Sequence, residues 1–389
     1  MSPAQYHAVT CPSIRDVDWA EWNQLRDPEG DPFMDPRYIL AVENSMGSVC
    51  RFRHVVFRDD DRHAVATACL CACTIEGPSL VDGTARKVVT AIDRLAPGLL
   101  GLRLLLCGLP VSCGSSHLRF APHVDHAAVL RPLDEVMQAF ASEERAHCLL
   151  FKEFEPLEAR HLTSLEELHY RRADSLPMNC VPSHHQSFED YLSTISSARR
   201  YKIRHSRQKA AALGLTFEHR SGAEGAAELY TDEVHRLYEA VLERAKVRFE
   251  RLPAEFFREM ARQLPQESLF TFAIHDGRIV GFALSLSCQE RFDQMFIGVD
   301  YELNRKLDLY FNTFYEALDA SLKRRPRLIY VGQTTDEVKH EKLGAYQVPL
   351  TLYAKGRRRL VRSVMAVRFK WFFPDRPLKY PATSAASTK

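Results

Sequence analysis

Residues 269–288, LFTFAIHDGRIVGFALSLSC, carry the clearest fold signal in this chain. Two apolar runs flank the dipeptide Asp276-Gly277, and an Asp-Gly pair between such runs is a strong local signal for a β-hairpin. The next apolar segment, residues 294–299, is typical of a further strand. The sequence therefore predicts a hairpin of strands 269–275 and 278–288 that continues into a larger sheet.

The rest of the chain alternates predicted strands and helices, which indicates α/β layers. After the hairpin we expect a helix over 309–323, a strand over 328–332, a helix over 335–343 and a closing strand over 346–354. Before it, the predicted helices of the second half are 187–213, with Ser187 as N-cap, 231–246 and 253–263. In the first half, the predicted strands are 53–57, 64–75, 103–107 and 148–154, and the predicted helices are 36–45, 133–144 and 156–168.

Composition excludes several classes of protein. Apolar residues make up 46% and charged residues 26% of the chain, which excludes a largely disordered protein. The 52 basic and 50 acidic residues nearly cancel, so no overall positive field indicates a nucleic-acid-binding protein. The N-terminus lacks the pattern of a secretory signal, and the apolar stretch 99–111 is too short to span a bilayer. We therefore expect a cytoplasmic protein with reduced cysteines.

Neither the cysteines nor the histidines predict a metal site. Cys69, Cys71 and Cys73 alternate and therefore point to one face of a strand, and the chain has no C-x-x-C motif. His123 and His126 form an H-x-x-H pair with no third ligand nearby in the sequence. We expect a buried strand face of thiols and no bound metal.

The order hairpin, strand, helix, strand, helix, strand over 269–354 resembles the core of the GNAT acyltransferase fold. Large GNAT-like acyltransferases related to Fem-type aminoacyltransferases are similar in finer detail, at SSARR (196–200), at 237–257 and at the ending Gly332-Gln333-Thr334 … Lys339 … Leu343-Gly344-Ala345. The resemblance covers 183–356 well and the first half only by layout. It implies an α/β protein of two GNAT-like domains, each a mixed central sheet flanked by helices. The expected ranges are 1–181 for the N-terminal domain, 182–356 for the catalytic domain, 357–380 for a basic aromatic segment and 381–389 for a disordered tail.

One part of the GNAT pattern is missing. Members that bind acetyl-CoA usually place a Gln/Arg-x-x-Gly-x-Gly/Ala loop before a helix, where backbone N–H groups hold the pyrophosphate. The matching stretch here, NRKLDLY at 304–310, has no glycine. Fem-type enzymes also tend to lack this loop. The resemblance therefore leaves two donors open, an acyl-CoA held in part by Arg305 and Lys306, or an aminoacyl-tRNA.

N-acyl transfer requires that an amine lose a proton, that an oxyanion be stabilised and that a leaving group be protonated. Polar groups for these steps are expected at the carboxyl ends of central strands. Asp300 follows strand 294–299 and is a candidate base, with capping of the next turn as the alternative. Tyr310 is a candidate acid for the leaving group, with a packing role as the alternative.

A second group of candidates surrounds the helix 335–343. The related transferases carry a lysine near Lys339, which makes Lys339 and its neighbour His340 candidate catalytic residues; a solvated helix face is the alternative. Gln333 and Thr334 end the preceding strand and offer amide and hydroxyl groups to a substrate or cofactor.

Basic residues on the helix 187–213 form a stripe. Arg200, Arg204 and Arg207 stand at i, i+4 and i+7, so they share one helix face. Such a stripe suits the phosphates of CoA, of tRNA or of a lipid head group. We favour phosphate binding over a solvated face, because few acids interleave with the arginines.

The C-terminal segment 357–380 combines eight basic residues and one acid, Asp375, with large apolar side chains such as Trp371 and Phe372. Basic and aromatic residues mixed in this way suit an anionic membrane surface, which residues 357–373 would contact. The alternative is a terminal helix that docks on the domain with its arginines exposed.

Three functions are compatible with these observations. The first is an N-acyltransferase that uses acyl-CoA as co-substrate, with no resident cofactor, and acylates a primary amine. The C-terminal segment favours a lipid amine such as a sphingoid base, and a location on the cytoplasmic face of the inner membrane; some bacterial ceramide synthases resemble this layout. The second is a Fem-type transfer from aminoacyl-tRNA to a peptidoglycan precursor or small amine, which the missing coiled-coil arm argues against. The third is a non-catalytic scaffold, which the retained Lys339 and Gly344 argue against.

Overall fold

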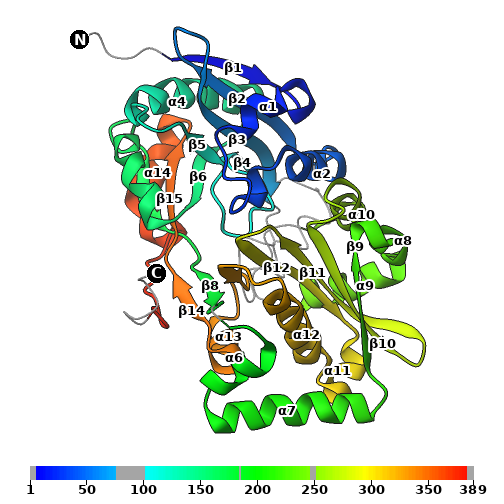
Figure 1. Cartoon of the computed structure of the whole chain (residues 1–389). Helices are drawn as coiled ribbons and strands as arrows, with labels where there is room; N and C mark the ends of the chain where they lie inside the picture. Colours follow the sequence, from blue (N-terminus) through cyan, green and yellow to red (C-terminus); the bar gives the residue numbers. More distant parts are fainter. Residues whose placement is uncertain (1–5, 76–100, 184, 246–250, 383–389) are drawn as a thin grey trace, which may run out of the picture.

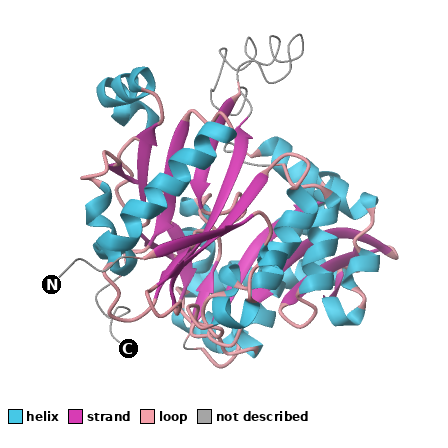
Figure 2. Ribbon diagram, turned by 90° about the horizontal axis from the view of Figure 1, so that it is seen from above, coloured by secondary structure: helices cyan, strands magenta, loops and turns pink. Residues whose placement is uncertain are grey.

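Two mixed sheets with helices on their faces make up the computed structural model, which describes residues 6–75, 101–183, 185–245 and 251–382 (Figures 1 and 2). The first sheet contains β1 (His7–Cys11), β2 (Arg51–Arg58), β3 (Ala64–Ile75), β4 (Leu102–Cys107), β5 (Leu118–Phe120), β6 (Cys148–Phe154), β7 (Arg171–Asp174) and β15 (Thr351–Gly356). Its order is β1-β2-β3-β4-β6-β15-β7, and β5 pairs with β3. The α/β fold predicted from the sequence is confirmed.

The second sheet carries the predicted hairpin. It contains β8 (Met178–Val181), β9 (Thr216–Ser221), β10 (Ser268–His275), β11 (Arg278–Ser287), β12 (Arg291–Val299), β13 (Leu328–Tyr330) and β14 (Tyr346–Val348). The order is β14-β8-β13-β12-β11-β10-β9, in which β10 and β11 are antiparallel neighbours across Asp276-Gly277. The hairpin prediction is therefore confirmed.

The helices pack on the faces of these sheets (Figure 2). Helices of the first half are α1 (Trp19–Asn23), α2 (Pro36–Met46), α4 (His126–Glu143) and α5 (Pro156–Ala159). Those of the second half are α6 (Phe188–Thr194), α7 (Ser197–Ala212), α8 (Ala226–Leu229), α9 (Asp232–Arg244), α10 (Ala254–Gln263), α11 (Tyr301–Leu307), α12 (Leu309–Lys323) and α13 (Asp336–Leu343), followed by α14 (Arg359–Phe372). Within the described ranges, no helix has the length and the apolar content that a bilayer crossing requires.

The chain crosses between the sheets near its end, where the sequence predicts one closing strand over 346–354. That prediction is wrong, because Pro349 and Leu350 separate β14 in the second sheet from β15 in the first. β15 lies between β6 and β7, and its orange colour stands among the blue and green strands of the first half in Figure 1. In the other direction, β8 belongs to the second sheet although it precedes residue 182. β8 and β15 thus each pair in the sheet built mainly from the other half of the chain.

The predicted helix 187–213 is two helices, α6 and α7. Ile195 is extended between them, with φ −92° and ψ 161°, and the Ser196 hydroxyl oxygen accepts a hydrogen bond from the backbone N–H of Arg199. Ser196 thus caps a new helix, as serine favours at an N-terminus. The Ser187 N-cap is confirmed, because its hydroxyl oxygen accepts from the N–H of Asp190.

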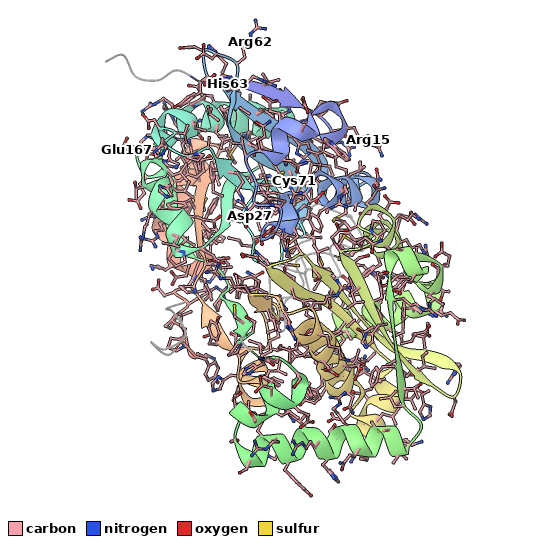
Figure 3. The ribbon with its side chains drawn as sticks, in the orientation of Figure 1. Arg15, Asp27, Arg62, His63, Cys71 and Glu167 are labelled. Atoms are coloured by element: carbon pink, nitrogen blue, oxygen red, sulfur yellow. The ribbon has the colours of Figure 1, made fainter. Side chains whose placement is uncertain are left out.

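The strand face of cysteines in β3 is also confirmed. Cys69 and Cys71 are buried in the core beneath α2, and Cys73 packs against the same core at the end of the row. Figure 3 labels Cys71 inside the first sheet, whereas Arg62 and His63 lie at the outer tip of the β2–β3 hairpin. At this tip, ligand atoms of Asp59, Asp61 and His63 lie within 4.8 Å of one another on an exposed acidic turn.

The C-terminal segment docks on both sheets. α14 packs on β15, and the chain after it reaches β14, where the backbone N–H groups of Lys379 and Tyr380 both donate to Oε1 of Gln347. Pro381 forms a bridge to Gln347. The docked terminal helix proposed as an alternative is therefore present, and the tail predicted to be disordered lies, from residue 383 on, outside the described residues.

Candidate active site

β12 and β13 diverge in the middle of the second sheet. They run parallel but pair only over Arg291–Asp293 and Leu328–Tyr330. Beyond this point β12 continues beside β11, whereas the chain after Tyr330 follows β8, with the N–H of Val331 donating to the carbonyl of Asn179 at 2.9 Å. Within the described residues, no strand pairs with this side of β12 beyond Asp293.

A bulge accompanies this divergence. The register between β11 and β12 shifts between Leu284 and Ser285, so that Met295 is an extra residue on β12. Met295, Phe296 and Ile297 are partly exposed although they lie in a central strand. Bulges bend strands and are enriched next to active sites, and here the bulge lies where β12 leaves β13.

Lys339 reaches the turn that follows β13. Its side chain, on α13, is buried with 7% of the residue exposed, and Nζ lies 3.1 Å from the position that a Cβ on Gly332 would occupy. Gly332 has φ +86°, a conformation that favours glycine. Burial lowers the pKa of Lys339 to about 7, and the charge of Asp336 offsets part of this effect. A lysine with this pKa can both accept and donate a proton near neutrality.

Asn179 holds this turn in place. Its Nδ2 donates to the carbonyl of Gly332 at 2.8 Å and to Oδ1 of Asp336 at 2.9 Å. Gln333, the next residue, donates from Nε2 to the carbonyl of Leu176 at 3.0 Å. The structure therefore brings together the predicted residues Lys339 and Gln333, and it adds Asn179, whose strand gave no sign of a functional role in the sequence.

The loop after β4 brings the first half to this site. A Cβ on Gly114, which has φ +77°, would stand 3.6 Å from Cδ of Gln333. Cys113, just before it, has φ +46°. Backbone strain of this kind clusters at functional sites. The glycine and serine residues of this loop, Ser112 to Ser116, were a signal that sequence reasoning missed.

Arg291 fixes the point at which the strands separate. Its guanidinium makes two hydrogen bonds of 2.7 Å to Asp293, donates to Oγ of Ser115 at 2.8 Å and lies 4.2 Å above the ring of Tyr330. The hydroxyl of Tyr330 in turn donates to Glu155 at 2.9 Å. Burial raises the pKa of Asp293, while Arg291 opposes the shift. This ionic group joins the two halves beside the point where β12 and β13 separate.

Asp300 and Tyr310 occupy structural positions. The carboxylate of Asp300 accepts from the N–H of Glu302 at 2.8 Å and caps α11, a helix that the sequence did not predict, in place of the turn into the helix 309–323. The ring of Tyr310 packs 5.4 Å from that of Phe311, and burial raises the pKa of Tyr310 to about 12. Its phenol therefore remains protonated at neutral pH.

The N-terminus of α12 is closed to an anion. Asp308 precedes it with φ 47°, and its carboxylate accepts from the hydroxyl of Ser206 at 2.5 Å. Oδ1 of Asn304 accepts from the N–H of Tyr310 at 2.8 Å. The N–H of Tyr310 is thus engaged by Asn304, and the carboxylate of Asp308, which makes no capping hydrogen bond, adds a negative charge beside the helix N-terminus where a pyrophosphate would bind. Arg305 and Lys306 lie exposed on the last turn of α11.

The arginine stripe is paired within the chain. Arg200 donates to the carbonyls of Leu192 and Ser193 at 3.2 Å each, Arg204 pairs with Glu189, and Arg207 donates to Glu316 at 2.8 Å. The partners lie on α6 and α12. Acids on neighbouring helices therefore neutralise Arg204 and Arg207, contrary to the prediction that few acids accompany the stripe.

The surroundings of His340 and Thr334 differ from those of Lys339. Nδ1 of His340 lies 2.9 Å from the carbonyl oxygen of Ala345, and its ring stacks on Tyr380 with centroids 3.9 Å apart. Thr334 is exposed.

A separate hollow of about 400 Å³ lies between α8, α9 and α10. It is lined among others by Tyr230, Thr231 and Arg258 and includes none of the predicted site residues.

Solved structures share this fold at low sequence identity. FemX aligns with a TM-score of 0.56 at 11% identity, over 90% of this chain and 98% of FemX. A tandem GNAT protein from the clavulanic acid biosynthesis pathway aligns with 0.51 at 14%, over 91% and 99%. L-PGS from Bacillus licheniformis aligns with 0.50 at 11%, over 90% and 98%. Each similarity supports a GNAT fold in two copies.

Sequence comparison gives the family. No curated protein matches the chain. The sequence profile of the FemAB-like family, described as peptidoglycan biosynthesis/recognition, matches residues 13–337. The resemblance to Fem-type and GNAT-like transferases is confirmed, whereas the comparisons lend the ceramide synthases no support. The chain therefore belongs to the FemAB-like family and is a group-transfer enzyme with the GNAT fold.

Proposed function

We propose that this protein transfers an acyl group from an activated donor to a primary amine, at the point where β12 and β13 separate. The observation that carries this proposal is the position of Lys339, whose buried side chain has a pKa of about 7 beside the divergent strands. An amine that attacks a carbonyl must lose a proton, and a group with this pKa is suited to take it at neutral pH.

The proposed reaction assigns a role to each part of the site. The amine nitrogen forms a bond to the acyl carbon, and N–H groups of β12 beyond Asp293 stabilise the oxyanion. The amine proton passes to Nζ of Lys339. The bond from the acyl carbon to the donor's sulfur or oxygen then breaks, and Lys339 returns its proton to that leaving atom. Asn179 holds the turn at Gly332, against which Lys339 is placed.

The first candidate donor is an acyl-CoA. Because Asp308 and Asn304 close the N-terminus of α12, its phosphates would instead contact Arg305 and Lys306, which are exposed on α11. A lipid amine is the acceptor class that we connect with this donor.

The second candidate donor is an aminoacyl-tRNA, with an amine of a peptidoglycan precursor as acceptor. Two observations favour the aminoacyl-tRNA. This donor needs no pyrophosphate cradle at the N-terminus of α12, where Asn304 already accepts a hydrogen bond, and the chain belongs to the FemAB-like family. The arginine stripe adds little support, because Arg204 and Arg207 pair with acids of this chain and Arg200 donates to its backbone carbonyls.

One assay with two arms tests the function and separates the donors. The protein is incubated with acyl-CoA of several chain lengths and a long-chain amine while thiol release is followed, and with charged tRNA and an amine while deacylation is followed. We expect amine-dependent turnover in one arm and its loss in Lys339→Met. Lys342→Met, on the same helix with Nζ 4.7 Å from the centroid of the Phe311 ring, is the control and should retain turnover. Turnover in neither arm, or full activity of Lys339→Met, would refute the proposal.

A further inference from the structure

α14 is held on the first sheet by one of its sides. Met365 and Phe369 are buried in a small core together with Ala354 and Cys148. Arg171 of β7 reinforces this contact, because its Nη1 donates to the carbonyl of Ala366 at 2.9 Å and its guanidinium lies 4.8 Å from the centroid of the Phe369 ring. These contacts hold the helix in place and bury one apolar side of it.

Three large apolar side chains of α14 face solvent among its exposed polar residues. Val367 is 81% exposed, Trp371 70% and Phe372 45%. Arg368, with φ −112° and ψ 20°, kinks the helix between Val367 and Trp371, so these two exposed side chains lie on either side of the kink. A helix that packs by one side normally carries polar residues on the other. Exposed apolar side chains of this size indicate a surface that binds a further partner.

Cations surround this exposed side. Arg359, Arg368 and Lys370 are exposed on the same helix, as is Arg171 on the adjacent strand. Two nearby acids are already engaged, since Asp375 pairs with Lys370 and Asp174 accepts from the N–H of Arg376. The surface therefore offers positive charge around an apolar centre.

We propose that the exposed side of α14 binds an anionic lipid surface, with Trp371 and Val367 at the level of the head groups and Arg359 and Arg368 against lipid phosphates. Tryptophan has an apolar body and a polar edge and favours the membrane interface. Basic residues beside it are attracted to anionic lipids within a Debye length. The helix lies on the surface and does not enter the bilayer. This inference stands whether or not the proposed acyl transfer is correct.

Vesicles made of lipid alone test the proposal without any protein partner. The full chain is sedimented with vesicles of phosphatidylglycerol and phosphatidylcholine, and with phosphatidylcholine alone. We expect binding to the first kind only, weakening as salt rises. Tryptophan emission should shift to the blue, because Trp371 is exposed whereas Trp22 is buried and Trp19 is partly buried.

Two variants identify the surface. Removing two cations in R359Q/R368Q should weaken partitioning about 25-fold, as expected for two basic residues near an anionic surface. V367S/W371S should abolish sedimentation with vesicles. Leu157→Ser, at an apolar residue that is 67% exposed on α5, and Arg236→Gln, on α9, are the controls and should bind as the parent protein does.

Equal binding to neutral vesicles, no binding to either kind, or unchanged binding by both variants would overturn the proposal. Thermal unfolding of each variant shows whether it remains folded. The acyl-transfer assay is run in detergent, so a failure of the proposed function leaves this result unaffected.

Discussion

Nζ of Lys355 lies 2.8 Å from Oδ2 of Asp134, although 221 residues separate them along the chain. Both side chains are buried, and Tyr170 and Gln138 also donate to the Asp134 carboxylate, at 2.7 Å each. Lys355 belongs to β15 and Asp134 to α4. The ion pair therefore ties the last strand of the chain to the first sheet.

Lys355→Met should destabilise the protein by about 3–5 kcal/mol, because it leaves a buried carboxylate without its counter-charge. The double variant K355M/D134L should regain part of this loss, since it removes the unpaired charge but leaves the buried Tyr170 hydroxyl without its acceptor. Urea unfolding measures both. Lys370→Met, which breaks the exposed pair with Asp375, should cost less than about 1 kcal/mol. A cost as small as this for Lys355→Met would show that the buried pair contributes little.

The activity should rise with pH through about 7, because Lys339 must be neutral to accept the amine proton. Lys339→Arg keeps the charge but stays protonated at all these pH values, so its kcat/KM should fall by at least about 100-fold. The measurement is a pH profile of kcat/KM for the parent protein and the variant. A flat profile between pH 6 and 8 contradicts the role of Lys339 as base.

Lys339 should also lower stability at acidic and neutral pH. Its pKa is lower in the folded protein than its ordinary value of 10.5, so the folded state binds fewer protons than the unfolded chain between about pH 7 and 10.5. The cost is full below pH 7 and disappears as pH rises towards 10.5, with an upper bound of about 5 kcal/mol. Lys339→Met should therefore be more stable than the parent at pH 6, with a gain that shrinks by pH 9. Thermal unfolding at both pH values tests this; equal melting temperatures at pH 6 would contradict it.

Gly332→Ala and Gly277→Ala form a matched pair. Both glycines have positive φ, +86° and +70°, so each alanine should cost about 1–2 kcal/mol in unfolding free energy. Only at Gly332 does the new Cβ meet a side chain, Nζ of Lys339 at 3.1 Å, whereas Gly277 has open space. We expect Gly332→Ala to lose activity and Gly277→Ala to retain it. Equal activity of the two variants would show that the turn at Gly332 does not position Lys339 for the reaction.

Arg291→Met should lower stability by about 3–5 kcal/mol at pH 7.5, because it leaves Asp293 buried without its partner. The pKa of Asp293 is already raised by burial and should rise further. Since protonation relieves an unpaired carboxylate, the deficit relative to the parent should shrink as pH falls to 5. Urea unfolding at the two pH values measures it. A deficit that grows at pH 5 would contradict this account.

The features that were predicted correctly depend on residues close together in the sequence. The hairpin around Asp276-Gly277 and α12 follow from local turn chemistry and periodicity, and the structure contains both. The resemblance to the related transferases indicated Gln333, at the end of one predicted strand, and Lys339, on the next helix. These features need no knowledge of the distant parts of the chain.

The features that the sequence did not predict depend on distant partners. β15 pairs with strands that precede it by about 200 residues, and nothing within 346–354 indicates that β14 and β15 belong to different sheets. The same holds for Arg207, whose partner Glu316 lies 109 residues away. Asn179 and the loop near Gly114 acquire their roles only when the two halves meet.

The place of β15 between β6 and β7 has a consequence for synthesis on the ribosome. All other strands of the first sheet have emerged well before residue 351, yet the slot between β6 and β7 stays empty until then. While residues 175–350 are synthesised, the nascent chain therefore exposes two strand edges that chaperones or other nascent chains can bind. Premature termination just before residue 351 would release a polypeptide whose second sheet is complete and whose first sheet is split.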